Sequence, residues 1–298
     1  PSMLRLVFTL ADLCLPLLRE TTRRVSISGV QDKVQLHRQG MRFVPVASGG
    51  DYILKPVPSH SSARFVYDIP ANETLTMDIA SEIFGIHTAE HALVEFKDGM
   101  PAYLTKRFDF RDGMKIRQED FCQLSNRSEE THGDNYKYDA SYEELAGLVR
   151  RFCPSHAIEN PKVFFQILFN YVFANGDAHL KNFSLYESRQ GDYILTPAYD
   201  LLNTSLHFPN EPTATGLDFF MDGHYTARYE VLGFYSSADF HELAGFYGVS
   251  SLEVDEMLSV FARKCVQVEE SVKTSRLSLE AKSLYLAKFH DRLKALAQ

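Results

Sequence analysis

The sequence predicts an α+β protein of two lobes, an N-terminal lobe rich in strands and a C-terminal lobe that is mainly helical. Short runs of alternating apolar and polar residues, separated by turn residues, recur through the first third of the chain. Apolar patterns of helical length dominate the rest, and the one at 161–173 is apolar on nearly every face. The 298 residues allow two such units. We therefore expect lobes at 1–107 and 108–298.

Composition and charge are those of an ordinary globular protein. Hydrophobic residues make up 45% of the chain and aromatic residues 12%, which argues against a disordered chain. The formal net charge is −8 and the pI about 5.8. Because the positive surplus that binds a phosphate backbone is missing, autonomous nucleic-acid binding is not expected.

The cysteines and the apolar runs bear on the compartment. Cys14, Cys122, Cys153 and Cys265 show no C-x-x-C spacing, which argues against a disulfide framework or a structural zinc site. No apolar run approaches the roughly 18 residues of a membrane span. We expect a soluble, cytoplasmic protein that does not associate with a membrane.

A turn ahead of the first clear strand has the chemistry of a phosphate loop. Ser26, Ser28 and Gly29 form a flexible turn, and residues 33–37 alternate as a strand does. Such a loop can present backbone N–H groups and Lys33 to phosphates. Because it contains one glycine and matches neither common nucleotide-binding pattern, a plain hairpin turn is the alternative.

The next predicted strands, at 43–46 and 52–56, end near Lys55. Alternation places Lys55 on the same face as Ile53, so that its amine is expected beneath the loop described above. A solvated lysine is the alternative.

A helix is predicted to open at Asn72 and to end at Gly85. Glu73, in its first turn, either complements the helix dipole or steadies Lys55. Two further strands, at 92–96 and 102–105, complete the sheet-rich part.

The second lobe contains several predicted helices. Ser141 opens one in capping-box form, and Asn160 with Pro161 caps the apolar helix that should be the buried spine of this lobe. Residues 203–230 show no clear period and are expected to form a long loop. The last helix is predicted at 279–297.

Polar residues gather directly after the spine helix, where a loop on a rigid base usually faces a ligand. Asp177 precedes Asn182 by five residues, and Asp200 follows eighteen residues later. Phosphoryl transfer needs this set, because one Asp accepts the proton of an attacking hydroxyl while an Asn and a second Asp hold Mg²⁺. Protein kinases use the same spacing of five. The alternative gives each residue a structural role in a turn or on the surface.

Seven short motifs, in family order, resemble the HipA family of bacterial toxin serine/threonine kinases. They lie at 28–33, 53–56, 72–73, 107–109, 118–123, 175–182 and 195–200. The resemblance implies a two-lobed protein-kinase-like fold that uses ATP and Mg²⁺. By the same resemblance Asp177 is the catalytic base, and Asn182 and Asp200 are the metal ligands.

The resemblance also implies a set of ATP-binding residues. Lys55 matches the phosphate lysine, backbone groups of Lys106 and Phe108 match the adenine-binding hinge, and Asp109 follows that hinge. His179 and Lys181 fall near the phosphates. The loop over the phosphates is represented by Ser28, Gly29, Val30, Gln31 and Lys33.

Two departures from HipA resemble the short HipT branch. Only 25 residues precede Ser26, so a small partner protein is implied that resembles the missing N-terminal subdomain. The pair Ser26 and Ser28 resembles the autophosphorylated Ser-x-Ser of that branch. The family implies an aminoacyl-tRNA synthetase as substrate and a DNA-binding antitoxin as partner, with DNA contacted only indirectly.

Two other functions remain open from the sequence. A small-molecule or lipid kinase shares the same logic of one base and two metal ligands. A non-catalytic partner of a DNA-binding antitoxin would retain the fold without the transfer reaction.

Overall fold

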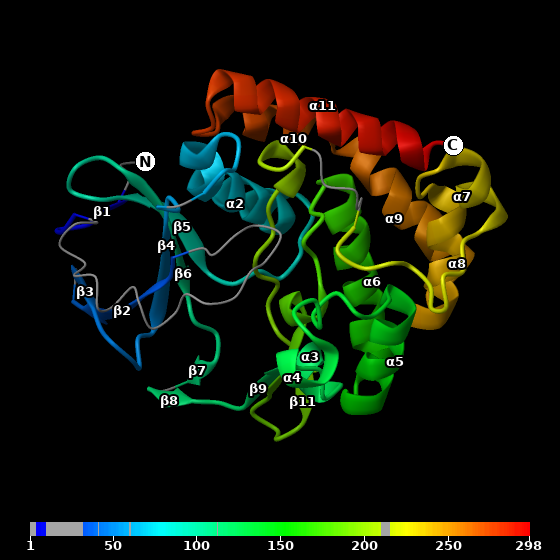
Figure 1. Ribbon diagram of the computed structural model, residues 1–298, viewed down its shortest axis with the longest axis horizontal. Helices are drawn as coiled ribbons and strands as arrows, with labels where there is room; N and C mark the ends of the chain where they lie inside the picture. Colours follow the sequence, from blue (N-terminus) through cyan, green and yellow to red (C-terminus); the bar gives the residue numbers. More distant parts are fainter. Residues whose placement is uncertain (1–3, 10–31, 41, 60, 112, 210–214) are drawn as a thin grey trace.

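The computed structural model describes residues 4–9, 32–40, 42–59, 61–111, 113–209 and 215–298. A β-sheet and a larger helical body lie side by side, and the last helix runs along one edge of the molecule (Figure 1). The predicted α+β architecture of a sheet-rich part followed by a mainly helical part is confirmed.

The sheet has six strands in the order β1-β5-β6-β4-β2-β3. β1 pairs with β5 in parallel, and the other neighbours are antiparallel. The strands are β1 (Leu4–Arg5), β2 (Val34–Gln39), β3 (Arg42–Pro45), β4 (Tyr52–Pro56), β5 (His91–Glu95) and β6 (Pro101–Lys106). The strands expected from alternation are confirmed, and β4, which carries Lys55, lies in the interior of the sheet between β2 and β6.

The helix after β4 begins earlier than the sequence pattern indicated. α2 spans Ile69–Asp78, with Pro70 in its first turn, and continues as the π-helical turn η2 (Ile79–Ile83). Proline is tolerated at that point because the first amides of a helix have no partner inside the helix. The expected start at Asn72 is therefore wrong, and Glu73 lies one turn inside the helix rather than at its dipole end.

The helical body is built around α6 (His156–Val172), which is buried along most of its length. Its start at Asn160 was predicted wrongly, because a first turn closes on Ser155, ahead of Pro161. Around it lie α5 (Tyr142–Phe152), α7 (Ala227–Leu232), α8 (Ser237–Tyr247), α9 (Ser251–Arg263), α10 (Cys265–Thr274) and α11 (Leu279–Leu296). Ser141 caps α5 as expected, accepting a hydrogen bond from the amide of Glu144.

Smaller elements connect the two parts. α3 (Phe121–Leu124), α4 (Glu129–His132), η1 (Val66–Asp68), η3 (Leu180–Asn182) and η4 (Thr204–Leu206) are short helices. β7 (Phe110–Arg111) pairs with β8 (Met114–Lys115), and β9 (Gln118–Asp120), β10 (Ser184–Glu187) and β11 (Tyr193–Leu195) form a three-stranded sheet. The predicted long loop at 203–230 thus contains η4 and the first residues of α7.

Two apolar cores divide the described residues. A small one lies within the sheet and includes Leu36, Leu54 and Leu104. A large one surrounds α6 and takes in the apolar side chains of α2, such as Leu75 and Met77. Because α2 packs against β5 and β6 and its apolar side chains also join the core around α6, it contacts both parts. The division at residue 107 stays a prediction.

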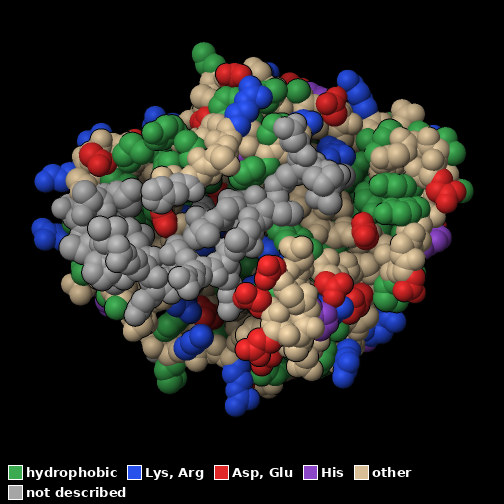
Figure 2. Space-filling view, in the orientation of Figure 1, with side chains coloured by type: hydrophobic (Ala, Val, Ile, Leu, Met, Phe, Trp, Pro, Cys, Tyr) green, Lys and Arg blue, Asp and Glu red, His purple; other side chains and the backbone are tan. Residues whose placement is uncertain are grey.

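The surface shows acidic and basic side chains interspersed over the described part of the face drawn in Figure 2. Among the described residues, no helix combines the length and the apolar character needed to cross a membrane.

Candidate active site

The loop that follows α6 is held by hydrogen bonds from two directions. Ala174 leaves the helix with a positive φ of 52°. The side-chain amide of Asn175 donates to Asn170 Oδ1 at 2.9 Å, and the amide of Gly176 donates to Thr204 Oγ1 at 2.8 Å. Thr204 in turn donates its own amide to the carbonyl of Ala174 at 3.1 Å. The stretch directly ahead of Asp177 is thus tied to α6 on one side and to Thr204 on the other, which positions Asp177.

Asp177 lies at the mouth of this loop with 14% of its side chain exposed. The hydroxyl of Tyr138 donates to its Oδ1, and His179 Nε2 lies 3.7 Å from the same oxygen. Burial, reinforced by the charge of Lys137, lowers the pKa of His179 to about 3. At neutral pH the imidazole is therefore uncharged and forms no ion pair with Asp177. It does not compete with a substrate hydroxyl for the Asp177 carboxylate.

Asp200 and Asn182 face each other. Asn182 Nδ2 lies 3.5 Å from Asp200 Oδ2, while Asn182 Oδ1 accepts the amide of His179 at 3.1 Å. Asp200 has a φ of +55°, a left-handed conformation that Asp adopts more readily than most residues. Burial acts to raise the pKa of Asp200, but Lys55 and Lys33 outweigh it and hold that pKa below its ordinary value.

Lys55 joins the sheet to the helical body through two carboxylates. Its Nζ lies 2.5 Å from Glu73 Oε1 on α2 and also donates to Asp200 Oδ1. Only 4% of Lys55 is exposed, so it is not the solvated lysine of the alternative interpretation. Burial acts to lower the pKa of Lys55, but the two carboxylates outweigh it and raise that pKa, while burial raises the pKa of Glu73.

The family model described as the HipA-like C-terminal domain matches residues 25–271. The chain belongs to this family. The match covers most of the sequence and includes the loop after α6, the Lys55 strand and Asp200.

Curated relatives carry kinase names. A protein from Haemophilus influenzae with the provisional name of kinase is 30% identical over 189 residues, covering 61% of this chain and 53% of that protein. The serine/threonine-protein kinase toxin HipA of Shewanella oneidensis is 26% identical over 231 residues, covering 71% of this chain and 51% of that protein. The chain spans about half the length of the curated relatives it matches.

Solved structures share the fold. HipA from Shewanella oneidensis, determined in a complex with HipB and operator DNA, has a TM-score of 0.67 and 21% identity, over 93% of this chain and 66% of that one. The Helicobacter pylori proinflammatory kinase CtkA has a TM-score of 0.54 and 13% identity, over 82% of this chain and 87% of that one. The predicted kinase-like fold is thereby confirmed.

The residues expected to form the adenine hinge make contacts with other residues of the protein. The amide of Lys106 donates to the carbonyl of Glu90 at 2.8 Å, and its exposed amine pairs with the Glu90 carboxylate at 2.7 Å. The ring of Phe108 packs 5.5 Å from that of Tyr199, centroid to centroid. Asp109 is buried and receives a two-pronged ion pair from Arg107, at 2.6 and 2.9 Å. The role of these residues toward a nucleotide stays a prediction.

The two lysines expected near the phosphates differ in their surroundings. Lys181 forms a 2.6 Å ion pair with Asp120, at the end of β9. Lys33 is exposed directly before β2, yet its charge acts on both Asp200 and Glu73. Ser26, Ser28, Gly29, Val30 and Gln31 lie outside the described residues.

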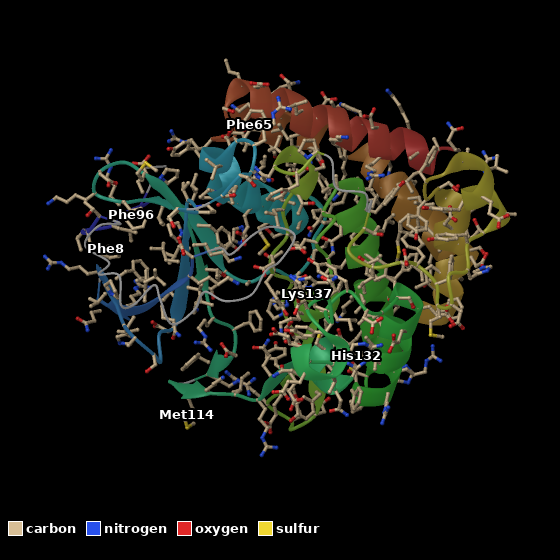
Figure 3. The ribbon with its side chains drawn as sticks, in the orientation of Figure 1. Phe8, Phe65, Phe96, Met114, His132 and Lys137 are labelled. Atoms are coloured by element: carbon tan, nitrogen blue, oxygen red, sulfur yellow. The ribbon has the colours of Figure 1, made fainter. Side chains whose placement is uncertain are left out.

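The fold adds two residues that the sequence analysis did not select. Lys137 lies near the middle of the molecule, between the sheet and the helical body (Figure 3), and is 8% exposed. Burial, together with Lys181 and Lys33, lowers the pKa of its amine. Tyr138 holds Asp177, as described above. In the sequence, Lys137 and Tyr138 are adjacent in a polar stretch and precede the cap of α5 by four and three residues. This was the signal that could have pointed to them.

Proposed function

We propose that the chain is an ATP- and Mg²⁺-dependent serine/threonine protein kinase. The observation that carries the proposal is the convergence of Lys55, Glu73 and Asp200 beside Asn182 and Asp177. This set comprises a phosphate-binding amine with its carboxylate support, two candidate metal ligands and a candidate base. Membership of the HipA-like family and the kinase names of relatives support it.

The site residues fit a nucleotide and a hard divalent cation. Asp200 offers carboxylate oxygen, and Asn182 offers amide oxygen once its amide rotates away from the His179 amide, as Mg²⁺ prefers oxygen ligands. Nδ1 of His179 is buried without a hydrogen-bond partner among the described residues, which leaves a polar atom for a ligand or water. When bound, Mg²⁺ supplies charge neutralisation at the phosphates.

The chain's own residues orient the reactants and move the proton. Lys55, held by Glu73, presents its charge toward the phosphates of ATP. Asp177 accepts the proton of the substrate hydroxyl, and the Tyr138 hydroxyl fixes the direction in which its carboxylate points. The neutral His179 ring packs edge-on to Tyr138, with ring centroids 5.0 Å apart, which helps to hold the Tyr138 ring in place.

We extend the proposal to a toxin of a toxin-antitoxin system. The substrate is a protein of the aminoacyl-tRNA synthetase class, whose phosphorylation inhibits translation in the cytoplasm. Partners are a DNA-binding antitoxin and a small protein that resembles the N-terminal subdomain of HipA. The Shewanella oneidensis HipA structure, which contains HipB and operator DNA, supports the antitoxin partner.

The pair Ser26 and Ser28 is the proposed site of autophosphorylation. A phosphate adds about −1.5 to −2 charges beside a site that must receive ATP, so phosphorylation should inhibit the kinase. Ser26→Asp and Ser28→Asp variants should bind ATP more weakly than the matching alanine variants. Equal ATP affinity and equal activity in the two sets would refute self-inhibition.

Transfer of labelled γ-phosphate tests the central proposal. Wild-type protein is incubated with labelled ATP, Mg²⁺ and a cell lysate, and the label is followed into proteins and into the metabolite fraction. Asp177→Asn should abolish transfer and keep ATP binding, whereas Asp192→Asn in the β10–β11 turn should behave as wild type. Label in metabolites alone would favour the small-molecule kinase. Equal labelling with wild type and Asp177→Asn would favour the non-catalytic partner.

A further inference from the structure

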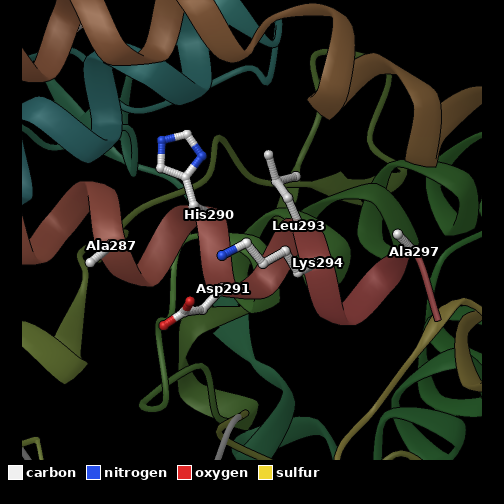
Figure 4. A pocket seen from close by; sticks show the side chains of 6 residues that line it. All are labelled: Ala287, His290, Asp291, Leu293, Lys294 and Ala297. Atoms are coloured by element: carbon white, nitrogen blue, oxygen red, sulfur yellow. The ribbon is translucent and has the colours of Figure 1, made fainter.

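Three side chains with different donor atoms meet on the side of the helical body where α10 packs against α11. Cys265 and Glu269 lie one turn apart on α10, and His290 comes from α11. The hollow along α11 in Figure 4 is lined by His290, which projects to a different side of the helix from Asp291. These residues take no part in the site around Asp177.

The distances approach those of a tetrahedral metal centre. His290 Nε2 lies 3.3 Å from Glu269 Oε1, and Cys265 Sγ lies 3.7 Å from the same oxygen. All three donor atoms lie within 4.8 Å of one another. Zn²⁺ bonds of the usual length at tetrahedral angles would place nitrogen and oxygen about 3.4 Å apart, and sulfur about 3.6 Å from either. The oxygen–nitrogen and oxygen–sulfur distances therefore already fit such a centre. At most, a side-chain rotation is needed to adjust the sulfur–nitrogen distance.

The donor types select the metal. Thiolate and imidazole together favour a borderline ion such as Zn²⁺ over Mg²⁺ or Ca²⁺, which prefer oxygen ligands. We propose that Cys265, Glu269 and His290 bind one Zn²⁺ ion, with water or an added ligand in the fourth position. His290 is 37% exposed and Glu269 29% exposed, so an ion can enter from solvent.

The hydrogen bonds around Glu269 indicate that metal binding at this site would release a proton. The Cys265 thiol donates to Glu269 Oε1, while the other Glu269 oxygen is paired with Lys273 at 3.4 Å. Metal binding replaces the sulfur–hydrogen bond with a sulfur–metal bond, and the proton passes to solvent. The thiolate and the carboxylate together balance the two charges of the ion.

Binding of Zn²⁺ would link α10 to α11, and α11 contacts α2. Tyr285, on α11, forms a 2.9 Å hydroxyl–hydroxyl hydrogen bond with Thr76 of α2, the helix that carries Glu73. A metal link between α10 and α11 should therefore raise the melting temperature of the helical body.

Zinc titration of the full chain tests the site. The metal-free protein competes with a chromophoric chelator for Zn²⁺, and Co²⁺ is used as a spectroscopic substitute. We expect one Zn²⁺ per chain, a thiolate-to-cobalt charge-transfer band and a higher melting temperature with Zn²⁺. Each of Cys265→Ser, Glu269→Gln and His290→Gln should weaken binding by more than about tenfold, since residues that merely orient a ligand already cost about 10–100-fold.

A matched control and the remaining thiols make the outcome decisive. His224 and Glu242 form an exposed histidine–carboxylate pair at 2.7 Å, and His224→Gln should leave zinc affinity and the cobalt spectrum unchanged. A cobalt–thiolate band that persists in Cys265→Ser would assign the metal to another cysteine and overturn the proposal. Equal zinc affinity in wild type and the three ligand variants would overturn it as well.

Discussion

The sheet and the helical body of this protein are stabilised in different ways. The described sheet has a small core of alternating apolar side chains such as Leu36 and Leu104. The helical body has a continuous core that extends from α11 through α6 to α2. Beyond apolar packing, α2 is fastened to the body by hydrogen bonds, with Asn72 exchanging two with the backbone of Asn203 at 2.8 and 3.1 Å.

This difference shows how the site is assembled. Asp177 and Asp200 are positioned by the helical body and Lys55 by the sheet, whereas Glu73 lies on α2, which packs against both. The ion pair from Lys55 to Asp200 therefore joins the sheet to the helical body, and the ion pair to Glu73 links Lys55 to α2. Under the proposed function, the sheet contributes the Lys55 amine, and Glu73 and Asp200 contribute the carboxylates that hold it.

The join itself can be broken with Lys55→Met, which leaves Glu73 buried without its cation. Removing one partner of a buried ion pair costs about 3–5 kcal/mol, so the free energy of unfolding in urea should fall by that amount. Adding Glu73→Gln should recover part of the loss. Lys106→Met, which removes an exposed partner of Glu90, should cost about 0–1 kcal/mol. Equal losses in both single variants would contradict the comparison.

The orientation of the Asp177 carboxylate within the helical body can be tested at Tyr138. Tyr138→Phe removes a hydrogen bond to the Asp177 carboxylate, worth about 1.5–3 kcal/mol for a charged acceptor. Under the proposed function, the rate of phosphoryl transfer should fall roughly 10–100-fold while ATP affinity stays the same. Kinetics and titration calorimetry measure both, with the exposed Tyr67→Phe as control. An unchanged rate would mean that the loop alone orients Asp177.

Burial of His179 makes the body's stability depend on pH. The pKa of His179 is lowered to about 3 in the folded protein, against about 6.5 in an unfolded chain. The unfolded state therefore binds more protons between these values, and stability falls as the pH drops below about 6.5. One such group costs about 2 kcal/mol between pH 7 and pH 5.

His179→Asn should make the fall in unfolding free energy over this pH range shallower than in wild type. The exposed His132→Asn should leave the slope unchanged. Parallel slopes for wild type and His179→Asn would show that the imidazole titrates freely in the folded protein.

Close packing around the loop that carries Asp177 can be probed at Gly216. A Cβ there would lie 2.4 Å from the backbone of Ala178, the residue after Asp177. Gly216→Ala should destabilise the protein by about 1–3 kcal/mol through overpacking and shift the loop. Gly147→Ala, in α5 with open space around it, should be neutral or stabilising by up to about 1 kcal/mol. Thermal unfolding of the pair measures the contrast.

The attachment of α2 to α11 is the mildest test. A double-mutant cycle of Thr76→Val and Tyr285→Phe should give a coupling energy of about 0.5–1.5 kcal/mol, the value of one hydrogen bond. Amide exchange in α2 should speed up in each single variant. A coupling energy near zero would mean that apolar packing alone holds α2 to the body.

Local patterns in the sequence were sufficient to predict the strands, the central helix and the loop that follows it. Alternation predicted the strands because side chains on a strand repeat every two residues, and the apolar pattern predicted α6 as the spine. The spacing from Asp177 to Asn182 predicted that the loop after α6 is the candidate catalytic loop, since a short loop on a buried helix keeps such residues together. Helix starts at Asn72 and Asn160 were predicted wrongly, because proline near a helix start is compatible with more than one first turn.

Only the tertiary structure decided which distant residues meet. Lys55 contacts Asp200 across 145 positions, Tyr138 reaches Asp177, and His290 joins Cys265 on a neighbouring helix. The position of α2, which packs against β5 and β6 and also joins the core of the helical body, was likewise not predictable from its sequence. A periodic pattern reports which face of an element is buried, whereas the partner on that face depends on how the whole chain packs.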